Sequence, residues 1–109
     1  EFKPHVLSIE NLYSHYNNPR TAIIMAHARG IPFLVANLNG LGVVEYSATK
    51  IKNSLTGYGR ATKEQMQRMV MNTLGLKEAP NPYDVTDALA AALCHANTIS
   101  HSMELEVQR

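Results

Sequence analysis

The sequence has little of what marks a disulfide-bonded, membrane-bound or strongly charged protein. Its 109 residues include one cysteine, Cys94, which cannot form an internal disulfide and so fits a reducing cytosol. The first residues do not have the pattern of a signal peptide, and no apolar run reaches membrane-spanning length, so no membrane partner is expected. Ten basic and nine acidic residues leave a net charge of +1, so a nucleic-acid partner must be argued from local clusters. These absences favour a soluble, cytoplasmic globular domain.

Several catalytic and metal-binding motifs are also absent. The chain contains no GxSxG, P-loop or GxGxxG sequence, so acyl transfer and nucleotide binding have no support. The five histidines show no ligand spacing, and Cys94 has no CxxC partner, so a zinc site is not indicated. His95 follows Asp84 by about 16 Å along a helix, too far for the two side chains to share an ion. The histidines are therefore interpreted as structural or surface residues.

Two short segments predict a parallel sheet in a single domain. Residues 5–10 (HVLSIE) and 43–46 (VVEY) are brief, mostly apolar and rich in β-branched side chains, as in buried parallel strands. Two such strands with four or five helices do not make a stable α/β layer, because parallel sheets need more strands and covered faces. We therefore expect an incomplete α/β fold, whose other strands are missing from this chain or are supplied by a partner.

The first predicted helix is apolar on nearly all sides. Asn18 is a good N-cap and Pro19 a good first helical residue, and the apolar pattern continues to Asn39. Such a helix is expected to be buried on several faces, between the sheet and a neighbour or at a subunit interface. Gly30 and Pro32 lie within it, and they predict a break just before Pro32.

Capping residues place two further helices. Ser47 is the expected N-cap of a short helix that Gly57 ends. Thr62 and Gln65 have the form of a capping box, and Gly75 ends the helix that they open.

The last predicted helix, over residues 81–96, carries two carboxylates, Asp84 and Asp87, in its first turns. Its apolar residues recur at helical spacing, and both acids share a face away from that stripe. Acidic residues at a helix start cap free N–H groups and complement the dipole, and taken alone these two favour that role. Beyond residue 96 the pattern fades, so residues 98–109 either extend the helix or fray.

Glu10 adds a third carboxylate at the end of the first predicted strand. In open α/β sheets ligands bind outside the carboxyl ends of the strands, although a solvated Glu is the simpler alternative. Glu10, Asp84 and Asp87 would converge if that strand end faces the helix, and Mg²⁺ prefers such oxygen ligands. Two ions about 3.5–4 Å apart would promote phosphodiester cleavage, with a fourth carboxylate expected from a missing strand.

Basic residues gather in the middle of the chain. Five of them lie within twenty residues and are opposed only by Glu64: Lys50, Lys52, Arg60, Lys63 and Arg68. Such a cluster suits contacts to phosphate groups, and a solvated helix face is the alternative. Tyr13, close to Glu10 in sequence, is able to stack on an unpaired base, and a core position is its alternative.

Three stretches carry a resemblance to a known family. They are residues 45–70 (EYSATKIKNSLTGYGRATKEQMQRMV), residues 83–96 (YDVTDALAAALCHA) and residues 8–10 (SIE), and residues 26–30 (AHARG) stand where the family has a QARG-like turn. In this order, over nearly the whole chain, they resemble the bacterial Holliday-junction resolvases of the RuvC family. The resemblance implies a ribonuclease H-like α/β fold, a homodimer and Mg²⁺-dependent nicking of four-way DNA junctions in recombination and repair. It also implies two Mg²⁺ ions per site and the RuvA–RuvB branch-migration complex as a partner.

The same resemblance assigns roles to individual residues. Three acids match the catalytic, metal-binding carboxylates of the family: Glu10, Asp84 and Asp87. Lys52 and Lys63 match basic residues that contact DNA, and Tyr13 matches an aromatic residue near the junction centre. The apolar helix from Pro19 matches the helix that passes through the dimer interface.

The sequence departs from the family pattern in two places. The N-terminal strands, with their Gly-x-Asp-Pro-Gly start and first catalytic Asp, are absent, so residues 1–109 are expected to be the C-terminal two-thirds of a single RuvC-like nuclease domain. The site of this chain would then lack one carboxylate, which puts its activity alone in doubt. Pro32 lies inside a helix that the family keeps continuous. A DNA-binding module without catalysis and a related ribonuclease H-like nuclease acting on other DNA structures remain the alternatives.

Overall fold

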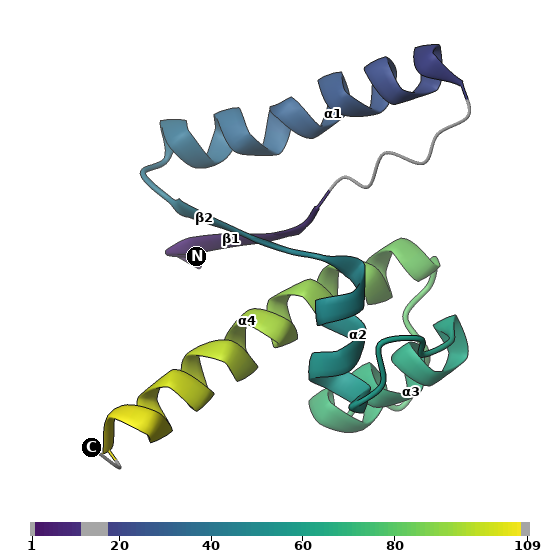
Figure 1. The fold of residues 1–109 in the computed structure, drawn as a ribbon, viewed down its shortest axis with the longest axis vertical. Helices are drawn as coiled ribbons and strands as arrows, with labels where there is room; N and C mark the ends of the chain where they lie inside the picture. Colours follow the sequence, from purple (N-terminus) through teal and green to yellow (C-terminus); the bar gives the residue numbers. More distant parts are fainter. Residues whose placement is uncertain (1, 12–17, 108–109) are drawn as a thin grey trace.

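A narrow parallel sheet separates one long helix from a group of three. The computed structural model describes residues 2–11 and 18–107. In chain order the elements are β1 (Val6–Glu10), α1 (Pro19–Leu38), β2 (Gly42–Tyr46), α2 (Ala48–Thr56), α3 (Lys63–Leu74) and α4 (Tyr83–Val107). Helix α1 lies on one side of the strands and the other three helices lie on the other side (Figure 1). The predicted α/β class is confirmed, with two parallel strands and, over the described ranges, four helices.

The two strands pair in parallel and end at the same edge, where Glu10 is opposite Tyr46. The amide of Asn11 donates to the carbonyl of Tyr46 over 2.8 Å and so extends the ladder by one bond. On the side of α4, the Ser8 hydroxyl donates to the main-chain carbonyl of Ala91 over 2.7 Å. This bond joins the first strand to the last helix.

The core lies where α2, α3 and α4 meet. Its buried members are apolar, and those on α4 are small: Ile51, Leu55, Ala61, Met66, Val70, Ala90, Ala91 and Cys94. Small side chains let α4 approach its neighbours closely. Helix α4 continues to Val107, so the C-terminal residues extend the helix through that position.

The predicted caps are confirmed. The Ser47 hydroxyl accepts from the amide of Lys50, and Thr62 and Gln65 make both bonds of a capping box. Gly57 and Gly75 end α2 and α3 with φ of 77° and 66°, a left-handed conformation that costs glycine little.

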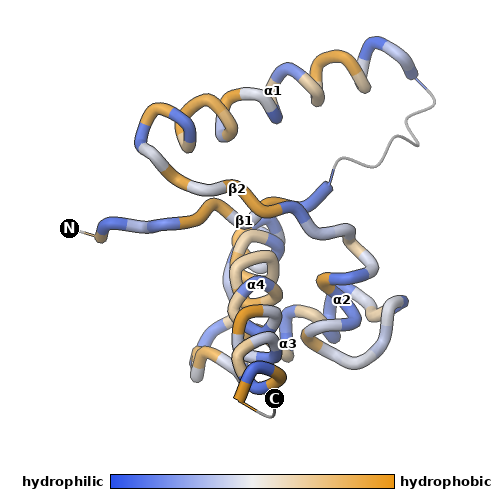
Figure 2. Tube along the Cα trace, turned by 60° about the vertical axis from the view of Figure 1, so that its left-hand side comes forward, coloured by the Kyte–Doolittle hydropathy of each residue, from blue (hydrophilic) through white to orange (hydrophobic). Residues whose placement is uncertain are grey.

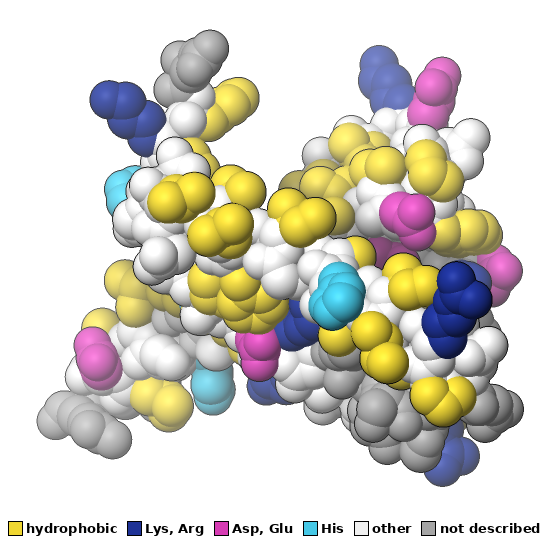
Figure 3. Space-filling model, turned by 90° about the horizontal axis from the view of Figure 1, so that it is seen from above, with side chains coloured by type: hydrophobic (Ala, Val, Ile, Leu, Met, Phe, Trp, Pro, Cys, Tyr) yellow, Lys and Arg dark blue, Asp and Glu magenta, His cyan; other side chains and the backbone are white. Residues whose placement is uncertain are grey.

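Helix α1 is apolar but poorly covered by the described residues. Ala36 is its one buried residue, whereas Ile31 and Leu38 are 63% and 74% exposed. Apolar stretches run along most of α1 (Figure 2), and the view from above shows apolar side chains gathered on this side of the molecule (Figure 3). The expected burial on several faces is thus not provided by the described part of the chain. A surface of this kind marks a site of contact with another molecule.

The predicted break before Pro32 is wrong. Helix α1 runs without interruption from Pro19 to Leu38 and includes Pro32. Proline removes one main-chain hydrogen bond, but the turns on both sides keep theirs, so the loss does not end a helix of this length.

The expectation that no segment reaches membrane-spanning length also needs correction. Helix α1 has 20 residues, and an 18-residue window within it has a mean hydropathy of 1.3, so it is long and apolar enough to cross a membrane by length and composition alone. One helix of this kind is weak evidence, because core helices of soluble proteins pass the same test. Its Arg29 side chain is 18% exposed and pairs with a carboxylate of β2.

Thr86 yields a test of the core. Its side chain is 1% exposed, and its hydroxyl has no hydrogen-bond partner among the described residues. Valine keeps the branched shape without the hydroxyl, so Thr86→Val should raise the free energy of unfolding by about 1–2 kcal/mol. Urea unfolding followed by circular dichroism measures the change. Thr86→Ala, which also loses a methyl group, is the control and should be less stable than Thr86→Val. A Thr86→Val protein no more stable than wild type would show that the hydroxyl is satisfied in solution.

Candidate active site

A cavity of about 240 Å³ lies at the carboxyl end of β1, beside α2, α3 and the first turns of α4. Its wall combines two carboxylates and two lysines with small or apolar side chains: Glu10, Asp87, Lys52, Lys63, Ala48, Ile51, Ala61, Met66 and Ala90. The position agrees with the rule that ligands of α/β sheets bind beyond the carboxyl ends of strands.

Glu10 is the last residue of β1, and side-chain alternation places it on the same face of the strand as Ser8, which contacts α4. Burial raises the pKa of Glu10 above its usual value, and the charge of Asp87 raises it further. The charges of Lys52 and Arg29 act in the opposite direction and lower that pKa. A proton or a cation near Glu10 is therefore favoured, because it relieves the repulsion between the two carboxylates.

The two acids of α4 are placed differently. Asp87, in the second turn, lines the cavity, whereas Asp84 lies in the first turn and is not among the lining residues. Within residues 2–11 and 18–107, no three His, Cys, Asp or Glu side chains are grouped closely enough to hold one metal ion. The structure thus brings Glu10 and Asp87 to one cavity. Asp84 stands where it complements the helix dipole, and its role as a metal ligand stays a prediction.

Two of the predicted DNA-contacting residues face the carboxylates. Lys52, from α2, and Lys63, the first residue of α3, both line the cavity. The Lys63 ammonium group lies 5.7 Å from the centroid of the Tyr83 ring, a cation–π contact that links the starts of α3 and α4. Tyr13 lies outside the described residues, so its predicted stacking on a base stays a prediction.

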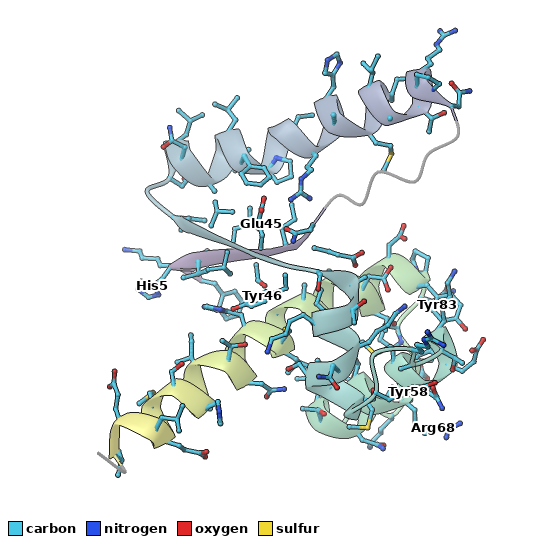
Figure 4. The ribbon with its side chains drawn as sticks, viewed as in Figure 1. His5, Glu45, Tyr46, Tyr58, Arg68 and Tyr83 are labelled. Carbon is cyan, nitrogen blue, oxygen red and sulfur yellow. The ribbon has the colours of Figure 1, made fainter. Side chains whose placement is uncertain are left out.

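Sequence reasoning missed an arginine that joins α1 to the strand ends. One terminal nitrogen of Arg29 donates to the carboxylate of Glu45 over 2.8 Å, and the other donates to the main-chain carbonyl of Glu10. The guanidinium carbon lies 5.2 Å from the centroid of the Phe33 ring. Glu45 extends from β2 toward α1 (Figure 4). The available signals were that Arg29 lies in the AHARG stretch matched to the family and that Glu10 and Glu45 occur near strand ends, but no spacing rule pairs position 29 with either acid.

A second contact joins β2 to α4. The Tyr46 hydroxyl and Nδ1 of His95 are 2.6 Å apart, and both side chains are partly buried. This bond gives His95 a structural role, which is one of the two roles that the sequence left open for the histidines.

The Glu10–Asp87 pair fits a hard divalent cation. Mg²⁺ takes oxygen ligands and is commonly held by one or two carboxylates together with water and substrate phosphate oxygens. Burial raises the pKa of Glu10, the charge of Asp87 raises it further, and a bound cation would relieve the repulsion between the two carboxylates. Lys52 and Lys63 on the same wall suit the phosphate oxygens that would complete the coordination.

Comparison with known proteins identifies the family of this chain. Residues 1–95 match the family model described as "Crossover junction endodeoxyribonuclease RuvC". The chain belongs to the RuvC family. It is 48% identical over 94 residues to RuvC of Caldicellulosiruptor saccharolyticus, and the alignment covers 86% of this chain and 56% of the relative. It is 45% identical over 103 residues to RuvC of Ruminiclostridium cellulolyticum, and the alignment covers 94% of this chain and 60% of the relative. The chain thus spans 56–60% of the length of these two RuvC proteins.

Solved RuvC structures have the same fold. The Thermus thermophilus RuvC structure matches with a TM-score of 0.81 and 35% sequence identity, over 91% of this chain and 59% of that one. T. thermophilus RuvC in complex with Holliday junction substrate matches with a TM-score of 0.81 and 32% identity, over 92% of this chain and 59% of that one. The predicted ribonuclease H-like α/β fold of RuvC is confirmed for the part that this chain spans.

The raised pKa of Glu10 predicts how stability depends on pH. A carboxyl group whose pKa is raised by folding contributes stability at low pH, and this contribution is lost as the pH rises through the raised value. Glu10→Gln removes the cost of holding that charge, so its free energy of unfolding relative to wild type should increase from pH 3 to pH 7. Urea unfolding at several pH values measures the difference. Glu78→Gln, outside the cavity, is the control and should show no such increase. A Glu10→Gln effect that is equal at pH 3 and pH 7 would contradict the assignment.

Proposed function

We propose that this chain is part of a structure-specific endonuclease of the RuvC type, which nicks four-way DNA junctions with the help of Mg²⁺ in recombination and repair. The observation that carries the proposal is the pairing of Glu10 and Asp87 in one cavity whose wall also holds Lys52 and Lys63. Membership of the RuvC family and the likeness to a RuvC structure solved with Holliday junction substrate support the choice of substrate.

The residues of the cavity divide the work in this proposal. Glu10 and Asp87 would hold the divalent ion, with Asp84 as a further ligand. Bound there, Mg²⁺ would supply Lewis-acid stabilisation of the charge that develops on the scissile phosphate. Lys52 and Lys63 hold phosphate oxygens of the DNA backbone and orient the scissile bond. Tyr13 stacks on a base at the opened junction centre.

The proposed enzyme is larger than the cavity seen in this chain. We place residues 1–109 in the C-terminal two-thirds of a RuvC-type nuclease domain, and the chain spans 56% and 60% of the length of the two relatives. The rest of that domain would supply a further carboxylate, which a site for two ions needs. We place the enzyme in the bacterial cytoplasm as a homodimer formed through α1. Its partnership with RuvA–RuvB stays a prediction from the family resemblance.

Asp87 is the residue on which to test catalysis. Asp87→Asn keeps the shape of the side chain but removes a charged ligand, which is worth several kcal/mol of transition-state stabilisation, so nicking should fall by about 10²-fold or more. The assay measures Mg²⁺-dependent nicking of a synthetic four-way junction by a chimera that restores the family's N-terminal strands from the C. saccharolyticus relative. Junction binding in EDTA, measured by gel shift, should change by less than about threefold, because no phosphate contact is lost.

The same assay includes a control variant and distinguishes the proposed nuclease from the two alternative functions. Glu78→Gln, a carboxylate outside the cavity, should nick like the parent chimera. If Asp87→Asn nicks as well as its parent, the catalytic assignment is wrong. A parent that binds junctions without nicking them would favour the DNA-binding module. A parent that cuts linear duplex as fast as junctions would favour a related nuclease with other DNA substrates.

The exposed face of α1 predicts self-association. Ile31 is 63% exposed, and it shares an outward stripe with Ile24, Val35 and Leu38. A charge at the centre of such a stripe would be desolvated without a partner, so Ile31→Asp should weaken the dimer by about 10²-fold or more. Sedimentation equilibrium measures the dissociation constant. Leu105→Asp, which places the same charge at an exposed apolar position of α4, should leave the dimer unchanged. An Ile31→Asp protein that dimerises like wild type would remove α1 from the interface.

A further inference from the structure

The peptide group that follows Glu10 is held at both of its polar atoms. Its carbonyl oxygen, which belongs to Glu10, accepts from the Arg29 guanidinium. Its N–H, which belongs to Asn11, donates to the carbonyl of Tyr46 over 2.8 Å. Fixing both polar atoms of this peptide plane restricts the ψ torsion of Glu10, which precedes the plane. That torsion sets the orientation of the Glu10 backbone. The direction in which the Glu10 side chain leaves β1 is therefore set by these two bonds.

Arg29 is itself held in place from two sides. Its second terminal nitrogen donates to the Glu45 carboxylate over 2.8 Å, and its guanidinium lies over the Phe33 ring at 5.2 Å. Arg29, from α1, thus bridges β1 and β2. Charge-assisted hydrogen bonds from a planar fork are strong and directional, which suits this side chain to fixing a backbone.

A sheet this narrow needs stabilising contacts such as the Arg29 bridge. Two strands form the sheet in the described part of the chain, and a sheet so narrow is marginal without further support. The carboxyl end of β1 is where support matters most, because Glu10 ends the strand there and lines the cavity. Arg29 approaches this end from the side of the sheet opposite to α4.

We propose that Arg29 is a positioning residue of the candidate active site. Its guanidinium fastens the ends of β1 and β2 together, so that β1 presents the Glu10 carboxylate to Asp87. Arg29 does not line the cavity, and its two terminal nitrogens each donate to a strand residue, Glu10 or Glu45, so it acts through the backbone rather than on substrate. The structural part of this proposal stands on the contacts alone, and the effect on nicking rests on the proposed function.

Amide hydrogen exchange tests the structural part in the 109-residue chain itself. In Arg29→Met the Asn11 amide should exchange at least about tenfold faster, because the charge-assisted bond that holds its peptide plane is gone. Arg29→Lys keeps the charge but loses the fork, so its exchange should be intermediate. Arg20→Met, on the first turn of the same helix, is the matched control and should leave Asn11 unchanged. The amide of Val70, in the core, reports global unfolding and should exchange alike in all four proteins.

Two results would overturn the structural part. One is an Asn11 amide that exchanges at the wild-type rate in Arg29→Met. The other is a faster Asn11 exchange that Val70 shares equally, because it would mean that the whole fold is destabilised.

Nicking by the chimera described above tests the consequence. Displacement of a catalytic group by about 1 Å costs about 10²-fold, so Arg29→Met should lower kcat by about 10- to 100-fold while KM for the junction stays within about threefold. Arg29→Lys should recover part of kcat. A KM effect with unchanged kcat would show instead that Arg29 binds DNA, and would overturn the positioning role. If the unaltered chimera does not nick, the proposed function fails, whereas the exchange result still decides whether Arg29 holds the strand end.

Discussion

The close packing of α4 against β1 is the interaction on which the candidate site depends. Ala91 is 4% exposed, and its carbonyl accepts the Ser8 hydroxyl across the contact. Glu10 lies two residues beyond Ser8, and Asp87 lies one helical turn before Ala91. Two residues of strand and four of helix span similar lengths, about 6–7 Å and about 6 Å, so one hydrogen bond sets the register of both carboxylates. A bulkier residue at Ala91 would separate the two elements and the two acids together.

This arrangement favours function over stability. Burial and the neighbouring Asp87 charge disfavour the ionised form of Glu10, and Lys52 and Arg29 offset this only in part, because the net effect is still a raised pKa. A domain that is only marginally stable tolerates such a site when the rest of the core is well packed. The core where α2, α3 and α4 meet offsets this cost. It contains small, buried side chains such as Ala90 and Cys94, which lie on the same helix as Asp87.

Local features of the chain were predictable, and contacts between distant residues were not. Ser47, Thr62 and Gly75 cap their helices as predicted, because capping depends on a few neighbouring residues. The two parallel strands and the position of Glu10 at a strand end followed from short apolar runs. The break predicted before Pro32 was wrong, because the loss of one main-chain hydrogen bond is offset by the helical turns on both sides. The bridge from Arg29 to Glu10 and Glu45 was not predictable, because no periodicity links a helix residue to two strand ends. The sequence does not show which acid of α4 lines the cavity with Glu10, because Asp84 and Asp87 share one helical face.

The burial of Cys94 gives this molecule a built-in reporter. The chain has one cysteine, and its side chain is 0% exposed in the core where α4 meets α2 and α3. A thiol reagent must wait for α4 to separate from that core before it reaches the sulfur. Because Asp87 lies on the same helix, the rate of thiol labelling measures how often the wall that carries this carboxylate opens, with no probe attached elsewhere.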